Sequence, residues 1–161
     1  MSTLISMAEA VGALLKERQE TLAVAESSTG GLIAAALLAV PGASAYFVGG
    51  GVIYTYKART ALLGVDLETH PGMRASTEPY ALLMATTIRE RLGTTWGLGE
   101  TGATGPSGNR YGDAPGHSCI AVCGPRSRSL TLETGQADRE ANMWLFARAA
   151  LDLLEEMARS G

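Results

Sequence analysis

The sequence has 161 residues, of which 46% are hydrophobic and 18% are charged, and its formal net charge is −3. This length allows one domain with a substantial core, and the composition is that of a globular protein rather than a disordered chain. The acidic balance and the lack of a basic stripe argue against a nucleic-acid-binding protein, and no apolar run approaches the roughly 18 residues of a membrane helix. The N-terminus has no signal-peptide pattern, so we expect one cytoplasmic domain over residues 1–161 that binds neither nucleic acid nor membrane.

The first part of the chain alternates between helical and extended patterns. Five segments follow in chain order: a helix at 2–19, a strand at 21–26, a helix at 30–40, a strand at 48–56 and a short helix at 57–65. The second helix opens with two glycines and stops at Pro41. The three glycines of the second strand indicate a bulge or a close approach of another backbone.

The second part of the chain continues this alternation and then breaks it. It predicts a helix at 77–93, a strand at 94–101, a loop at 102–116, strands at 117–124 and 127–135, and a long helix at 138–160. Thr77 is the expected N-cap of the first of these helices and Gly93 its end. The last two strands flank Pro125, which favours a hairpin. The pattern predicts an α/β fold with a mostly parallel sheet and at least one antiparallel strand.

Two cysteines, Cys119 and Cys123, lie four residues apart in one predicted strand and so share a face of the sheet. Two thiols without further ligands are too few for a zinc site, and buried structural thiols are expected instead. We therefore expect no metal.

The segment AESSTGG, residues 25–31, links the first predicted strand to a helix. Ligands of open α/β sheets bind at the carboxyl ends of strands, beside the free amides of helix N-termini. The hydroxyls of Ser27, Ser28 and Thr29 and the backbone of Gly30 and Gly31 are candidate binding groups there. The alternative is that these residues only cap the helix, because the segment matches neither common phosphate-binding pattern.

The segment ETGATGPSGNRYGDAPG, residues 100–116, is a second glycine-rich loop that follows a strand. Long irregular loops inside a domain are usually functional, so the two loops are expected to line one pocket. Arg110 and Tyr111 would suit a phosphate and an aromatic ring, although a solvated loop tip explains them equally well. Tyr46, Phe47, Tyr54 and Tyr56 are further candidates for stacking on a ring, with packing between the sheet and a helix as the alternative for some of them.

Several motifs together resemble one known family. AESSTGG, VPGASAYFVGGGVIYTY, LLGV, TGATGPSG and PGHSCIAV resemble, in register, the C-terminal domain of the CinA competence-damage family. Free-standing members of that family include the PncC-type nicotinamide mononucleotide (NMN) amidohydrolases. The resemblance implies a three-layer α/β/α sandwich with a mixed sheet, and it implies a homodimer. It also implies hydrolysis of the NMN carboxamide to nicotinic acid mononucleotide and ammonia, without a cofactor.

The resemblance also suggests roles for individual residues. Ser27 matches the presumed nucleophile, and Ser44 and Thr101 match the serine of the PG-x-S segment and the threonine of TG-x-x-GP. Gly102 and Gly105 belong to the same TG-x-x-GP motif and are expected to lie against the substrate. An arginine early in the last helix is expected to hold the substrate.

The sequence departs from the family pattern at the presumed base. Aligning on the LLGV motif puts Arg59 where relatives have a lysine, and a guanidinium stays protonated, so it cannot act as a base. It could still bind a phosphate or carboxylate. Lys57 could replace the base if the chain is still extended there, whereas an exposed lysine is expected if the helix has begun. His117, with Asp113 nearby, is another candidate base for Ser27, with a packing or surface histidine at the start of a strand as the alternative.

Two further departures concern neighbouring positions. Ser28 replaces the cysteine that usually follows the nucleophile, and GQA, residues 135–137, replaces the usual GDR. The expected arginine falls on Ala141 or Asn142, and Arg139 could compensate. Two hypotheses therefore remain open: a serine amidohydrolase with amides of residues 29–31 as the oxyanion hole, and a catalytically silent nucleotide-binding or regulatory domain.

Overall fold

The computed structural model describes residues 2–160, which build one five-stranded sheet with the strand order β2-β1-β3-β4-β5. The strands are β1 (Leu22–Glu26), β2 (Phe47–Val52), β3 (Trp96–Ala103), β4 (His117–Cys123) and β5 (Arg128–Glu133). β1 pairs in parallel with β2 and β3, whereas β4 is antiparallel to both β3 and β5. The expected mixed sheet and the β4–β5 hairpin are confirmed, although only half of the pairings are parallel.

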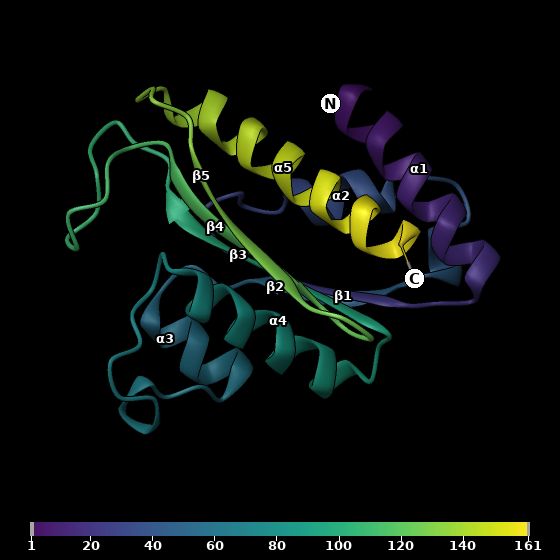
Figure 1. Cartoon of the computed structure of the whole chain (residues 1–161), viewed down its shortest axis with the longest axis horizontal. Helices are drawn as coiled ribbons and strands as arrows, with labels where there is room; N and C mark the ends of the chain where they lie inside the picture. Colours follow the sequence, from purple (N-terminus) through teal and green to yellow (C-terminus); the bar gives the residue numbers. More distant parts are fainter. Residues whose placement is uncertain (1, 161) are drawn as a thin grey trace.

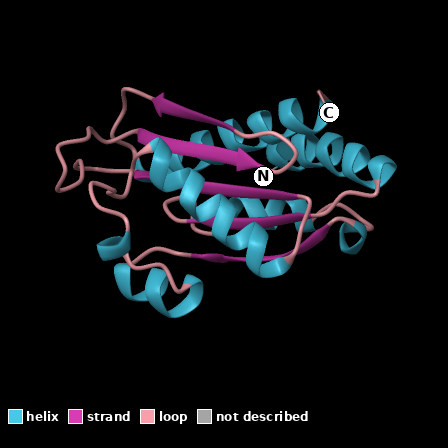
Figure 2. Cartoon of the chain, turned by 60° about the horizontal axis from the view of Figure 1, so that its bottom comes forward, coloured by secondary structure: helices cyan, strands magenta, loops and turns pink. Residues whose placement is uncertain are grey.

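Helices cover both faces of the sheet, so the three-layer α/β/α architecture is confirmed (Figures 1 and 2). α1, α2 and α5 lie on one face, and α3 and α4 lie on the other (Figure 1). The α-helices are α1 (Ser2–Arg18), α2 (Leu32–Leu38), α3 (Tyr56–Ala58), α4 (Glu78–Leu92) and α5 (Arg139–Arg159). Short helical turns span Ala43–Ala45 (η1), Arg59–Leu63 (η2) and Leu67–Thr69 (η3).

The alternation of side chains along β1 divides the core between the two layers. Leu22 and Val24 pack into the larger cluster, formed with α1, α2 and α5. Ala23 and Ala25 face the smaller cluster, which includes Tyr80 and other residues of α4. Successive strand residues point to opposite faces of the sheet, and both faces are covered here. Every residue of β1 is therefore buried. The strand that leads into the candidate site is therefore held on both sides.

Two glycines explain how closely the elements pack around this strand. A Cβ atom on Gly50 of β2 would lie 2.0 Å from the carbonyl oxygen of Val24. A Cβ atom on Gly99 of β3 would lie 2.2 Å from the carbonyl oxygen of Ala81 in α4. Both distances are far inside van der Waals contact, so only glycine fits. The close backbone approach expected for the glycine strand is confirmed, and β1 also has a register irregularity between Leu22 and Ala23.

The end of β2 differs from the prediction. The strand stops at Val52, and the chain bends into α3 at Tyr56 instead of remaining extended through that residue. Thr55 is the N-cap, because its hydroxyl accepts the amide of Ala58 at 3.1 Å. Hydroxyl capping thus overrides the strand-like pattern of the tyrosines. As a consequence, Lys57 and Arg59 follow helical rather than strand geometry.

Candidate functional site

A cavity of about 440 Å³ opens at the carboxyl ends of β1 and β3. Its lining comes from both glycine-rich segments and from two segments between them: Ser27, Tyr54, Thr55, Tyr56, Ala75, Ser76, Thr101, Gly102, Arg110 and Tyr111. Ligands of α/β proteins usually bind at this end of the sheet, where the parallel strands finish. The two loops expected to line one pocket therefore do so.

Ser27 follows directly after β1 and is half-buried at the wall of this cavity. Its amide donates to Glu100 Oε1 at 3.0 Å, which fixes the backbone from which its side chain projects. Within residues 2–160, no side chain forms a hydrogen bond with Ser27 Oγ. Ser27 thus lines the cavity, and its hydroxyl has no side-chain proton acceptor among the described residues.

Two buried glutamates hold the loop that carries Ser27. Glu100 Oε1 also accepts the amide of Thr29 at 3.0 Å, and its Oε2 accepts the hydroxyl of Ser28. Glu26 accepts the hydroxyl of Thr29 at 2.6 Å. The Thr29 hydroxyl lies 2.9 Å from Glu100 as well and so bridges the two carboxyl groups. Burial raises the pKa of Glu26, and the hydrogen bonds that it accepts offset this only in part.

The expectation that amides of residues 29–31 form an oxyanion hole is wrong. The amide of Thr29 is bound by Glu100, that of Gly30 by the carbonyl of Ser27, and that of Gly31 by Glu26. Glu26 also accepts two amides of the first turn of α2, so the helix terminus is already neutralised. In this loop of the described chain, only the amide of Ser28 has no hydrogen-bond acceptor.

Arg59 and Lys57 occupy different environments. Arg59 is only 6% exposed, and its guanidinium lies 4.6 Å from the ring centre of Tyr56 and 5.8 Å from that of Tyr80. Its Nε has no partner in the described structure. Lys57 is exposed and does not line the cavity. The interpretation that Lys57 reaches the pocket is wrong, because α3 has already begun at Tyr56 and turns its side chain outward.

A smaller cavity of about 250 Å³ adjoins the first and shares Tyr54 and Gly102 with it. Ser28, Gly105 and Arg139 also line it. Arg139, the first residue of α5, donates to the carbonyl of Gly105 at 2.6 Å and to the hydroxyl of Tyr54 at 3.2 Å. The structure therefore brings Arg139 to the same region as the two glycine loops, as expected if it compensates for the missing arginine.

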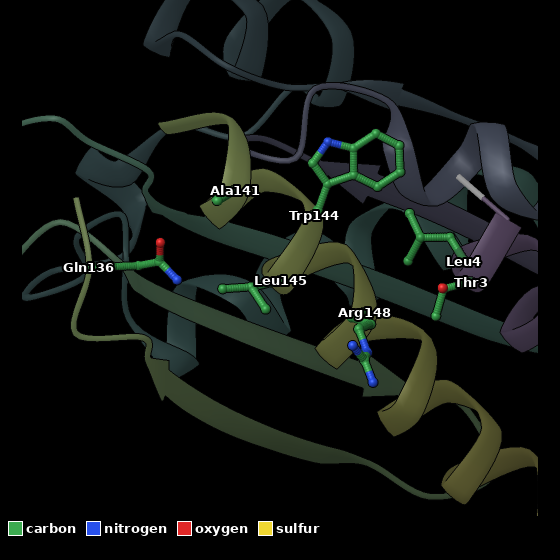
Figure 3. A pocket seen from close by; sticks show the side chains of 7 residues that line it. All are labelled: Thr3, Leu4, Gln136, Ala141, Trp144, Leu145 and Arg148. Atoms are coloured by element: carbon green, nitrogen blue, oxygen red, sulfur yellow. The ribbon is translucent and has the colours of Figure 1, made fainter. Parts of the chain in front are cut away.

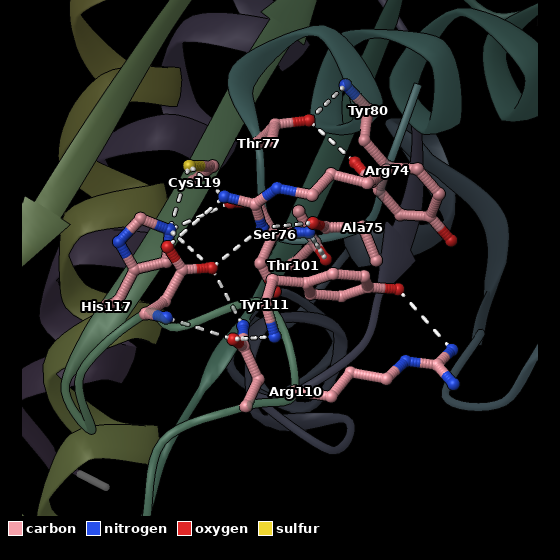
Figure 4. A network of polar contacts seen from close by, with 12 residues as sticks. Arg74, Ala75, Ser76, Thr77, Tyr80, Thr101, Arg110, Tyr111, His117 and Cys119 are labelled. Carbon is pink, nitrogen blue, oxygen red and sulfur yellow. Dashed lines mark hydrogen bonds and ion pairs between the residues drawn. The ribbon is translucent and has the colours of Figure 1, made fainter. Parts of the chain in front are cut away.

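Thr101 and His117 belong to a polar network beside the cavity (Figure 4). The hydroxyl of Thr101 accepts the amide of Ser76 at 3.0 Å, while His117 Nε2 lies 2.8 Å from the carbonyl oxygen of Ser76. His117 Nδ1 lies 2.5 Å from Glu133, and Asp113 is 3.7 Å from Nε2. Both ring nitrogens therefore face acceptors.

This arrangement rules out His117 as the base for Ser27. A carbonyl oxygen can only accept, so Nε2 donates to Ser76, and Nδ1 is held by the carboxyl group of Glu133, so neither ring nitrogen is free to take the proton of Ser27. Burial alone would lower the pKa of His117, but the contacts with Glu133, Ser76 and Asp113 outweigh burial and raise it. The hypothesis of a Ser27–His117 pair is wrong, because His117 binds Glu133 of β5 and the carbonyl of Ser76, in the loop before α4, and contacts no part of Ser27.

Ser44 does not lie at this site. It is an exposed residue of η1, three positions before β2, and β1 and β2 run in parallel from Leu22 and Phe47. Ser27 follows the end of β1, so the five residues of that strand, at about 3.3 Å each, separate the two serines along the sheet. Within one chain, the expectation that Ser44 contacts the substrate is therefore wrong.

Several residues that organise the site are absent from the sequence-based candidates. Glu100 and Tyr80 are buried around it, and Arg74 binds Asp113 at 2.8 Å, which lowers the pKa of that carboxyl. The only available signal was Glu100 itself, a charged residue inside the otherwise apolar strand WGLGETGA. A charge in a buried strand must have polar partners, so it marks a functional or structural site.

Another cavity, of about 450 Å³, lies between the start of α1 and the first turns of α5 (Figure 3). Leu4, Trp144 and Leu145 supply apolar surface, and Arg148 is the cation among its lining residues. None of the sequence-predicted site residues reaches it. The Ser27 cavity is therefore the candidate site.

Comparison with known proteins identifies the family. Residues 4–158 match the CinA C-terminal domain. The chain belongs to the CinA C-terminal domain family. A CinA-like protein of Synechocystis sp. is 38% identical over 96% of this chain, and one of Gloeobacter violaceus is 42% identical over 92%. The chain spans 37% and 35% of the length of these two relatives.

Solved structures of the CinA superfamily share the fold. A superfamily protein from Klebsiella pneumoniae has a TM-score of 0.91 at 27% identity, covering 98% of this chain and 99% of that one. One from Escherichia coli has a TM-score of 0.88 at 28% identity, covering 95% and 90%. Both are described as competence-damaged (CinA) superfamily proteins. Within residues 2–160, no helix of this CinA domain is long and apolar enough to cross a membrane.

Proposed function

We propose that this CinA domain hydrolyses the carboxamide of nicotinamide mononucleotide, giving nicotinic acid mononucleotide and ammonia, with Ser27 as the nucleophile. The observation that carries this proposal is the position of Ser27. It lines the same cavity as Tyr54, Tyr56, Tyr111 and Arg110. Tyrosine rings suit a nicotinamide, and an exposed arginine suits a phosphate. The family resemblance of the AESSTGG and TGATGPSG motifs supports the same reaction.

The chemistry proceeds through an acyl-enzyme. Ser27 Oγ adds to the carboxamide carbon, and the amide of Ser28 donates to the oxyanion because it is free in the loop. The C–N bond then breaks, and ammonia leaves with the proton that Ser27 has lost. Water cleaves the resulting ester and restores the serine. Because Ser27 Oγ has no side-chain acceptor in the described structure, solvent carries its proton, and we expect turnover to be slow.

A second candidate is a catalytically silent domain that binds the same nucleotide. Two observations favour it: Arg59 stands where the family resemblance implies a lysine, and His117, the other candidate base, is held by Glu133 and Ser76. Neither group can accept the serine proton. In this reading the cavity and its loops persist for binding and regulation.

Ammonia release from NMN separates the two candidates. The purified protein is incubated with NMN, and ammonia is followed alongside Ser27→Ala and the control Ser127→Ala, which alters an exposed serine in the β4–β5 turn. The hydrolase predicts activity that Ser27→Ala abolishes and Ser127→Ala leaves intact. The silent domain predicts calorimetric binding of NMN without ammonia from any variant. Activity that survives Ser27→Ala would contradict the proposed nucleophile.

We further propose that the protein acts as a cytoplasmic homodimer. β2 is an edge strand without a charged residue, and Val48 and Val52 on it are 51% and 44% exposed. Edge strands that stay unpaired usually carry charges or proline, so pairing with a second copy would explain this edge. Cys119 and Cys123 are free thiols, as is usual for proteins of reducing compartments.

A further inference from the structure

Four tyrosine and arginine side chains beside the Ser27 cavity form an alternating stack. The guanidinium of Arg59 lies 4.6 Å from the ring centre of Tyr56, and that of Arg110 lies 4.4 Å from the same ring. Arg110 also lies 5.3 Å from the ring of Tyr111, whose hydroxyl its Nη2 approaches to 3.4 Å (Figure 4). One tyrosine ring is thus in contact with two cations.

The cations of this region are not equally compensated. Arg74, which lies 4.8 Å from the ring of Tyr111, is neutralised by Asp113 in a two-point contact. For Arg59 and Arg110, residues 2–160 contain no carboxylate within ion-pair distance. The net charge of the chain is −3, so this local excess of positive charge is not a general property of the protein.

The buried position of Arg59 makes its isolation informative. Its side chain is 6% exposed, its Nε has no hydrogen-bond partner in the described part of the chain, and its Nη1 donates a long hydrogen bond, at 3.5 Å, to the hydroxyl of Tyr80. An unpaired charge removed from water is costly, and cation–π contacts recover only part of that cost. An anion bound nearby would supply the missing compensation.

The geometry directs such an anion to the cavity of Ser27. Arg110, Tyr56 and Tyr111 all line that cavity, and the hydroxyls of the two tyrosines are in contact, which joins the segment after β2 to the second glycine loop. Arg110 can meet a ligand directly. Arg59, behind Tyr56, adds positive charge in a low-dielectric region where charges act more strongly than in water.

We propose that Arg110, supported by Arg59 through Tyr56, forms a subsite for a phosphate monoester of the ligand. Guanidinium groups bind phosphate through paired, charge-assisted hydrogen bonds. Arg110 is the contacting residue, and Arg59 is a positioning residue that holds Tyr56 and contributes its charge. The inference rests on the proposed function for the rest of the substrate, but phosphate binding itself needs no hydrolysis.

Calorimetry in the Ser27→Ala background tests the subsite, because that variant leaves the ligand intact. The probes are NMN, nicotinamide riboside, which differs from it by the phosphate, and ribose 5-phosphate, which lacks the nicotinamide. Arg110→Met and Arg59→Met remove each charge while keeping an unbranched side chain. Arg91→Met, an exposed arginine at the end of α4, is the matched control.

We expect Arg110→Met to weaken NMN and ribose 5-phosphate binding by about 10- to 100-fold, the usual range for charge-assisted hydrogen bonds. Binding of nicotinamide riboside should stay the same. Arg59→Met should show the same selectivity with a smaller effect, and Arg91→Met should show none. A thermal melt establishes that each variant is folded, and if Arg59→Met is not, Arg110→Met alone decides.

Equal weakening of NMN and riboside by Arg110→Met would overturn the subsite. So would a parent Ser27→Ala protein that binds phosphorylated and unphosphorylated probes equally. If ribose 5-phosphate binds in an Arg110-dependent way while NMN is never hydrolysed by the native protein, the subsite stands and the proposed activity fails. If NMN is hydrolysed but the phosphate has no effect on binding, the activity stands and the subsite fails.

Discussion

Glu100 Oε1, in the middle of β3, accepts the amide of Ser27 at 3.0 Å. This contact joins β3 to the carboxyl end of the neighbouring parallel strand β1 and fixes the backbone of the candidate nucleophile. Glu100 is 1% exposed and also binds Ser28, Thr29 and Ser118. The position of Ser27 therefore depends on a carboxylate that is 73 residues away in the sequence.

Glu100→Gln tests this dependence. The substitution keeps the shape of the side chain but replaces an acceptor oxygen with an NH2 group. An NH2 group can only donate, so it cannot accept hydrogen bonds from the amides and hydroxyls that face Glu100. We expect the free energy of unfolding to fall by about 2 kcal/mol, the usual cost of a broken buried hydrogen bond to a charged group. Urea denaturation measures it, with the exposed Glu90→Gln in α4 as the control. Equal stability of both variants would mean that Glu100 does not hold the loop.

His117 predicts a pH dependence of stability. Its pKa is raised in the folded state, so the folded protein binds the proton more tightly than the unfolded chain. The resulting stabilisation is fully present below the unfolded value of about 6.5 and is lost as the pH rises through the folded pKa. Urea denaturation should therefore give a lower unfolding free energy at higher pH across this window.

His117→Gln should remove this slope, since glutamine does not titrate. The comparison uses the difference between the two proteins at each pH, because titratable groups that do not contact His117 contribute equally to both. A slope of the opposite sign in that difference, or no difference, would show that folding does not raise the pKa of His117.

Arg59→Lys should increase amidase turnover. A lysine in this buried position would have its pKa lowered by desolvation, so part of it would be unprotonated, and the family resemblance assigns the base of Ser27 to this position. We expect kcat to rise by about 100-fold, the lower end of the range for a positioned general base, and to increase with pH. The Michaelis constant for NMN should rise too, because the fixed charge near the phosphate is lost.

Arg91→Lys is the control for that experiment, since it makes the same chemical change at an exposed position on α4. Steady-state ammonia release, measured across a series of NMN concentrations and pH values, gives kcat and the Michaelis constant. A variant Arg59→Lys that is as slow as the native protein at every pH would show that position 59 cannot serve Ser27.

Replacement of Val48 and Val52 by lysine should separate the proposed dimer. Charges on an edge strand block pairing with another strand, while these side chains are exposed and should tolerate the change. Light scattering should give a dimer mass for the native protein and a monomer mass for the double variant. A native protein that is a monomer at all concentrations would refute the dimer.

Much of the fold could be predicted from the sequence because local signals agreed with tertiary packing. Thr77 caps α4 and Gly93 ends it, as their residue types indicate. The segment at 54–56 could not be predicted, because its tyrosines favour a strand while the hydroxyl of Thr55 caps a helix. Two local preferences therefore oppose each other, and the structure shows that the helix cap prevails, because the chain bends after β2.

The candidate site was predictable in outline and not in its contacts. Ser27, Thr101 and Arg110 line one cavity because β1 and β3 are neighbouring parallel strands, so the two glycine loops that follow them lie at the same end of the sheet. The role of the amides could not be foreseen, because Glu26 and Glu100 reach them from different strands. The charged Glu100 in an apolar strand indicates buried polar partners, but the sequence does not say which amides they are.

Detection of the acyl-enzyme is the most direct test of the proposed reaction. Native protein is mixed with excess NMN, quenched with acid at early times, and analysed by intact mass and peptide mapping. We predict a nicotinoyl mononucleotide ester on Ser27, formed together with ammonia and absent from Ser27→Ala. Ammonia released at an undiminished rate by Ser27→Ala, with no adduct on the native protein, would contradict it.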